Sequence, residues 1–185
     1  MPTTDQPGSM GWSRLAAMIV VSTAVMFILM YQLVYSTDHA YFSLNRFLSA
    51  LIMGGVMTAI MLGFMWDMYH PRAIKVAVLW SGIAVAAILL VLNRTQALVD
   101  DTAFMNAMIP HHSIAINNAR KASISDPRVR KLADEIIAGQ VREIEEMKIL
   151  TADIKRHGPR GSAPLPPIPA TVTPAMSAEI AQSVQ

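Results

Sequence analysis

Residues 47–66 read FLSALIMGGVMTAIMLGFMW and contain no charged side chain. At a rise of about 1.5 Å per residue, a helix of this length reaches across the roughly 30 Å hydrocarbon core of a bilayer. Residues 15–35 also carry no charge, and residues 73–92 carry only Lys75, near their start. The sequence therefore predicts three membrane-spanning helices within residues 15–95, preceded by a short N-terminal segment, residues 1–14.

The composition agrees with a membrane setting. The 185-residue chain is 53% hydrophobic and only 15% charged, whereas about a quarter of the residues in soluble domains are charged. The expected partner of the apolar runs is the lipid bilayer. A net charge of +2 without a basic cluster gives no reason to expect a nucleic-acid partner.

The orientation follows from the loops between the predicted spans. Residues 67–75 contain two basic residues and His70, whereas residues 36–46 contain one basic residue, at their edge. The positive-inside rule then places the N-terminus and the second loop in the cytoplasm, although Arg94 counts against this orientation. With three spans, the C-terminal part is expected in the periplasm, anchored to a bacterial inner membrane.

Residues 99–157 are predicted to form a hairpin of two helices. Asp100, Asp101 and Thr102 are suitable for capping a helix that runs to about Ser123. Pro127 is suitable for the first position of a second helix, which runs to about Lys155. The apolar stripe expected to face inward on the second helix consists of Val129, Leu132, Ile136, Gln140, Ile144, Met147 and Ile154.

A hairpin of about 55 residues is marginally stable without a metal or a partner. We therefore expect a homo-oligomer, in which two hairpins form a four-helix bundle across a dimer. The fold class is all-α throughout. Residues 158–185 are rich in Pro, Ser, Ala and Thr, so they are predicted to be disordered or extended, with a short helical turn near residues 175–182.

Residues 104–112, FMNAMIPHH, carry the residue types most suited to chemistry. With 3.6 residues per helical turn, Met105, Met108 and His112 share roughly one face, with His111 beside them. Thioethers and imidazoles form a soft ligand set, and softness favours Cu(I). The alternative is that the methionines only fill the core, which is their commonest role.

The pattern FMxxMIPHH at residues 104–112, together with IIAxQxxEIxxM at residues 136–147, resembles domain-of-unknown-function family 305. This ferritin-like helical family includes the periplasmic copper-binding protein CopM. The membrane part, MLxFMxDMY at residues 61–69, resembles a recurring three-span version of the family. The resemblance implies periplasmic copper binding by His and Met ligands, which fall here on Met105, Met108, His111, His112 and Met147.

The chain departs from the family pattern at two points. Many members have a Met a few residues after the His pair, where this chain has Asn117 and Asn118. Many soluble members also carry two copies of the hairpin, whereas this chain has one. A site built within one chain and a site shared between two chains therefore remain alternatives.

A second methionine row lies in the predicted membrane region at Met53, Met57, Met61 and Met65. A Cu(I) path along this row is one interpretation. Ordinary apolar packing is the favoured one, because Gly54 and its neighbours provide the small surfaces that membrane helices pack against.

Three functions are compatible with these patterns. The favoured one is a membrane-anchored copper-binding protein that sequesters Cu(I) or transfers it to a copper-handling partner, contributing to copper tolerance. The second is a copper-dependent oxidase or other metalloenzyme, although no catalytic constellation is found and no His has a Glu three residues before it, as a di-iron bundle needs. The third is a structural or interaction module of a membrane complex.

Overall fold

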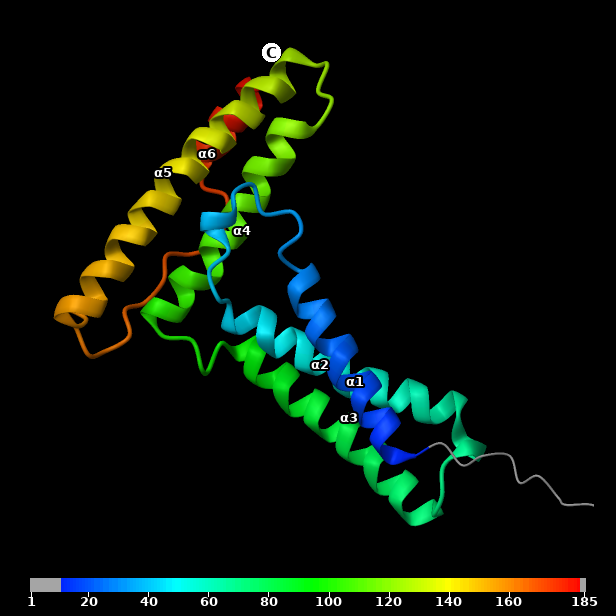
Figure 1. The fold of residues 1–185 in the computed structure, drawn as a ribbon. Helices are drawn as coiled ribbons and strands as arrows, with labels where there is room; N and C mark the ends of the chain where they lie inside the picture. The colour runs from blue at the N-terminus through cyan, green and yellow to red at the C-terminus, as the bar shows by residue number, and fades with distance from the viewer. Residues whose placement is uncertain (1–10, 184–185) are drawn as a thin grey trace, which may run out of the picture.

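The computed structural model describes residues 11–183, which form six α-helices and no strand. The chain makes two arms that diverge from the junction between α3 and α4 (Figure 1). The membrane arm contains α1 (Trp12–Leu29), α2 (Leu44–Phe64) and α3 (Arg72–Thr95), and the hairpin arm contains α4 (Asp101–Lys121) and α5 (Pro127–His157). The all-α prediction and its two-part organisation are therefore confirmed.

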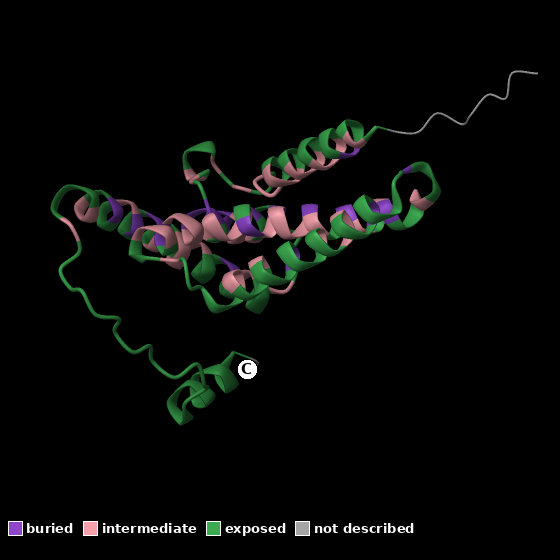
Figure 2. Cartoon of the chain, turned by 90° about the horizontal axis from the view of Figure 1, so that it is seen from below, coloured by how far each residue is buried: buried purple, intermediate pink, exposed green. Residues whose placement is uncertain are grey.

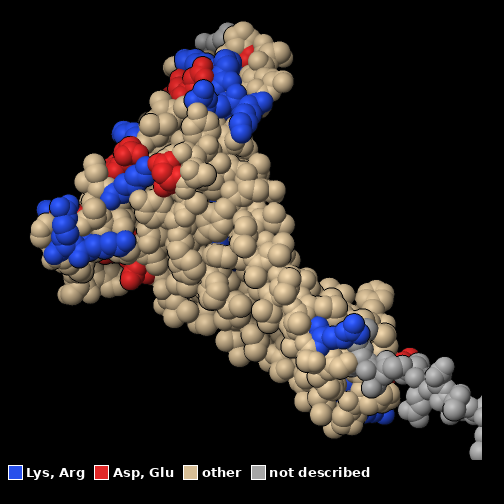
Figure 3. All heavy atoms as spheres, viewed as in Figure 1, with Lys and Arg blue, Asp and Glu red and all other residues tan. Residues whose placement is uncertain are grey.

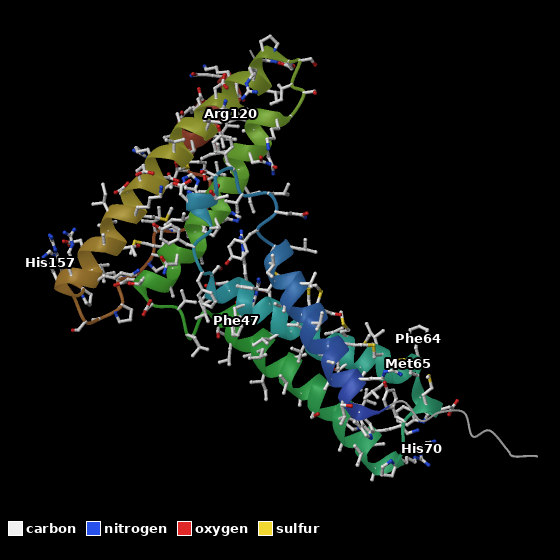
Figure 4. The ribbon with its side chains drawn as sticks, viewed as in Figure 1. Phe47, Phe64, Met65, His70, Arg120 and His157 are labelled. Carbon is white, nitrogen blue, oxygen red and sulfur yellow. The ribbon has the colours of Figure 1, made fainter. Side chains whose placement is uncertain are left out.

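The three helices of the membrane arm are long and apolar enough to cross a bilayer. Their most apolar 18-residue windows have mean hydropathies of 1.9, 2.0 and 2.4. Their outer surfaces are apolar as well, and Phe64, which is 90% exposed, points away from the arm (Figure 4). Charged side chains gather over the hairpin and at the far end of the membrane arm, with an uncharged surface between them (Figure 3). This distribution fits a helical bundle that faces lipid.

Small residues of α2 determine how the spans pack. A buried row at a spacing of four residues, Ala50, Gly54, Thr58 and Leu62, runs along this helix. A Cβ atom added to Gly54 would lie 2.6 Å from Thr23 Oγ1 of α1, and one added to Gly55 would lie 2.7 Å from the Gly82 carbonyl oxygen of α3. The two adjacent glycines therefore allow α1 and α3 to approach α2 on different faces, in the way that small residues permit in membranes.

Side-chain caps start both helices of the hairpin. Asp100 accepts a hydrogen bond from the backbone N–H of Ala103 at 2.7 Å, and Asp126 accepts one from that of Arg128 at 2.8 Å. Such caps satisfy N–H groups that have no partner within the helix. Pro110 is buried inside α4, which continues through it. The core between the two helices consists of Met105, Ile109, Ile116, Ile144 and Met147.

The predicted inner stripe of α5 is wrong in its first half. Val129, Leu132 and Ile136 are 49%, 57% and 38% exposed. The buried positions of this helix are Ala133, Ile144, Met147 and Thr151. The buried face of this half of α5 carries the small side chain of Ala133, and the larger apolar residues lie beside that face and remain uncovered.

The loop between α1 and α2 contacts the hairpin. Its η1 turn (Thr37–His39) lies against α4, and the Asp38 carboxylate forms an ion pair with the ammonium of Lys148 of α5 at 3.1 Å. Tyr35 accepts a short hydrogen bond from Arg120, and Tyr41 packs against the hairpin core. The loop therefore lies on the same side of the membrane arm as the hairpin and connects the two arms.

The C-terminal tail extends away from the hairpin core. It includes a short helix, α6 (Pro174–Gln182), where a helical turn was predicted. Every residue from 159 to 183 is exposed, and Figure 2 shows this segment in the exposed colour throughout. These residues add no packing to the hairpin or the membrane arm.

Candidate metal centre

A cavity of about 390 Å³ lies between α4 and α5. Four of the five predicted ligands line it: Met105, Met108 and His112 from α4, and Met147 from α5. The remaining lining residues are Asp101, Phe104, Glu143, Glu146, Leu150 and Ile154. Residues three or four positions apart share a helix face, which is why α4 presents its ligand types together.

The fifth predicted ligand, His111, lies elsewhere. Its side chain is exposed and does not line the cavity, and its ring centroid is 6.1 Å from that of His112. Adjacent residues on a helix differ by about 100° in direction. One helix face therefore presents a single member of the His pair to the cavity.

The thioethers of Met105 and Met147 are buried in the hairpin core. Met105 is 6% exposed and Met147 is 8% exposed. The Thr151 hydroxyl donates a hydrogen bond to the Met105 sulfur at 3.7 Å. Met108 is half-buried against the same cluster. Sulfur atoms supplied from two helices thus border one small space.

His112 lies in the cavity as a neutral ligand would. Its Nδ1 atom is 3.1 Å from Glu143 Oε2 but makes no well-aligned hydrogen bond. Burial lowers the pKa of His112, Glu143 opposes this effect, and the electrostatic interaction with His111 adds to it. The ring is therefore uncharged at neutral pH, the form that binds metals.

Glu143 and Glu146 also line the cavity, although neither was predicted as a site residue. The signal that would have found them is helical spacing, because Glu143 lies four residues before Met147 and shares its face. Carboxylates are harder ligands than thioethers. Among the described residues there is no group of three or more His, Asp and Glu side chains suited to a metal.

A second polar cluster has the residue types of a Ser-His-Asp triad. The Ser113 hydroxyl lies 3.0 Å from His39 Nδ1, and His39 Nε2 lies 3.5 Å from the Asp38 carboxylate. However, Ser113 is fully buried and its oxygen accepts a hydrogen bond from the Tyr35 backbone N–H at 2.8 Å. A nucleophile must reach its substrate, so this cluster instead fastens the α1–α2 loop to α4.

The fold and the cavity define a class of protein, a helical protein with three candidate membrane spans followed by a two-helix hairpin. Residues 71–162 match the family described as Domain of unknown function (DUF305), and the chain belongs to this family. The match includes α3 as well as the hairpin, whereas the resemblance covers roughly residues 100–154.

The chain is also similar to a viral protein described as "Uncharacterized protein L153" from Acanthamoeba polyphaga mimivirus. The two are 35% identical over 114 residues, which cover 60% of this chain and 73% of the viral protein. No solved structure matches the chain.

Proposed function

We propose that the protein binds Cu(I) in the hairpin cavity and sequesters it or transfers it to another copper-handling protein. The observation that carries this proposal is the presence of three thioethers and one neutral imidazole around a single cavity of about 390 Å³. Three thioethers and a neutral imidazole carry no charge, and this combination favours a soft monovalent cation over harder divalent ions. Glu143, beside His112, supplies one negative charge that balances the cation.

Metal selectivity tests the proposal. In a competition titration with a chromophoric Cu(I) chelator, we expect the full chain to retain Cu(I) or Ag(I) at least about 100-fold more tightly than it retains Zn(II). Fe(II), which prefers harder ligands, should compete poorly. Equal or tighter retention of Zn(II) would contradict a site governed by thioethers.

The exposed half of α5 supports the proposal that two hairpins associate. Val129, Leu132 and Ile136 follow the three- and four-residue spacing of a coiled-coil seam and remain uncovered in one chain. A second copy of the same hairpin would cover them and complete a four-helix bundle. Because the cavity borders the exposed residues Phe104 and Leu150, a partner hairpin would also shield its mouth.

We expect light scattering of the detergent-solubilised full chain to give a dimer. Replacing Leu132 and Ile136 with glutamate should convert it to a monomer, because two charges would be desolvated at the interface. Ala138 is exposed on the other side of α5, so Ala138→Glu is the matched control and should remain dimeric. A monomeric parent protein would exclude this association.

The biological role also depends on which side of the membrane the hairpin occupies. The α1–α2 loop contacts the hairpin, so both are expected on the side of the membrane opposite the basic α2–α3 loop. The positive-inside rule places the basic loop in the cytoplasm, so the hairpin is expected in the periplasm. Alkaline phosphatase fused to the C-terminus should be active, and a fluorescent protein that matures only in the cytoplasm should remain dark there. The reverse pattern would expose the site to cytosolic copper and would contradict a role in periplasmic tolerance.

A further inference from the structure

An apolar groove of about 830 Å³ lies among α1, α2 and α3 of the membrane arm. Its floor is formed by Ala50, Gly54 and Thr58 of α2, and its sides by residues such as Phe27 of α1 and Ser81 of α3. Small residues occupy the floor because α1 and α3 pack against α2 on different faces, as described above. The space between these two helices is left without side chains to fill it.

The dimensions of the groove limit what can occupy it. From Phe47 to Thr58 the floor rises by about 17 Å, close to the roughly 15 Å of one leaflet's hydrocarbon. The residues that line the groove are apolar or small, with Thr23, Thr58 and Ser81 as the polar exceptions. A groove of this length and lining suits a flexible acyl chain.

An incompletely paired cation lies at the end of the groove nearest the hairpin. Arg46 is in the first turn of α2, next to Phe47, which lines the groove and lies at the junction of the arms (Figure 4). Its guanidinium stacks over the Tyr31 ring at 4.5 Å. The guanidinium also has a side-chain hydrogen bond with Tyr31, and no carboxylate among residues 11–183 is one of the groups that act on it. Its Nη1 atom is buried and makes no hydrogen bond with the described residues.

Aromatic contacts connect this cation to the groove. Tyr31 meets Phe27 with ring centroids 5.6 Å apart, and Phe27 meets Phe47 at 6.0 Å. Phe27 and Phe47 both line the groove. The cation and the apolar channel therefore belong to one continuous surface near the membrane boundary, where lipid phosphates lie.

We propose that this surface binds one phospholipid, with an acyl chain in the groove and the phosphate on Arg46. A partly buried guanidinium with a free N–H is costly unless an anion accompanies it. Arginine pairs well with phosphate because its planar group donates several hydrogen bonds. One ligand accounts for both the unpaired cation and the unfilled groove. This proposal does not depend on copper binding.

Native mass spectrometry of the full chain released from mixed vesicles tests the proposal. With phosphatidylglycerol as the probe, we expect one tightly retained lipid per chain and at least tenfold less retention in Arg46→Gln. Arg94→Gln is the matched control, because Arg94 is an exposed arginine in the last turn of α3, at the same end of the membrane arm. Its retention should stay within about twofold of that of the parent protein. Equal losses of lipid retention in Arg46→Gln and Arg94→Gln would show that any positive charge at this end of the membrane arm has the same effect. That result would overturn the proposal.

A second variant tests the groove without changing the cation. Ser81→Phe places a bulky side chain in the groove from its exposed side, so retention of both phosphatidylglycerol and a diacylglycerol with the same chains should fall. The parent protein should retain the diacylglycerol less than phosphatidylglycerol, because it lacks the phosphate. Three outcomes would each contradict a phospholipid as the occupant of the groove. These are unchanged lipid retention in Ser81→Phe, displacement of the lipid by inorganic phosphate alone, and a dimer that carries no bound lipid.

Discussion

Replacing Met105, Met108 and Met147 together with leucine is expected to lower the Cu(I) affinity of the full chain by roughly 100-fold or more. Changes to groups that only orient a ligand typically cost 10- to 100-fold, and these substitutions remove three proposed ligands outright. A 100-fold change corresponds to about 2.7 kcal/mol of binding free energy. Competition with a chromophoric Cu(I) chelator measures it.

Leucine is the appropriate replacement because its volume is close to that of methionine. Such exchanges usually cost less than about 1.5 kcal/mol each, so the hairpin should stay folded and helical by circular dichroism. The control protein carries Met26, Met57 and Met176 as leucine, none of which lines the cavity. If both triple variants bind Cu(I) as the parent protein does, the hairpin cavity is not the copper site.

The second large effect is expected at Gly55. In Gly55→Leu, the new Cβ atom would lie 2.7 Å from the Gly82 carbonyl oxygen and 3.0 Å from Ala86 Cβ. Backbone cannot move aside as a flexible side chain can, so α2 and α3 must separate. We expect the free energy of unfolding of the membrane arm to fall by about 3 kcal/mol, the upper part of the usual range for overpacked sites. Unfolding in mixed detergent, followed by circular dichroism, measures this change.

Gly63 provides the matched control on the same helix. A Cβ atom at this position meets nothing within 4 Å, and the residue is exposed. Gly63→Leu should therefore change the free energy of unfolding by no more than about 0.5 kcal/mol, as is usual for exposed positions. Similar losses in the two variants would show that the close contact with α3 does not determine the effect.

Features governed by local chain properties were predictable from the sequence. The α2 and α3 helices overlap closely with the apolar runs that predicted them, and α4 and α5 begin beside the capping residues Asp100 and Asp126. The first span is shorter than predicted, because α1 ends at Leu29 while its uncharged run continues to Tyr35. Residues 30–35 are uncharged, yet they leave the helix and begin the loop that contacts the hairpin.

The sequence could not predict contacts that form across large separations. His39 and Ser113 are 74 positions apart, yet their side chains meet at 3.0 Å. Asp38 and Lys148 are 110 positions apart and still form an ion pair. Such pairs depend on the direction in which the two arms leave their junction, and no local pattern encodes that direction.

The sequence by itself determined the three apolar spans, the capped hairpin and the methionine-histidine face of α4, because each depends on residue composition or on the helical period of 3.6 residues. Only the tertiary structure decided that His112 and not His111 lines the cavity, that Glu143 lies beside it, and that half of the apolar stripe of α5 stays uncovered. A periodic pattern shows which residues share a face. Which part of that face is buried depends on the rotation of each helix against its neighbour, and that rotation is set by side chains on both helices.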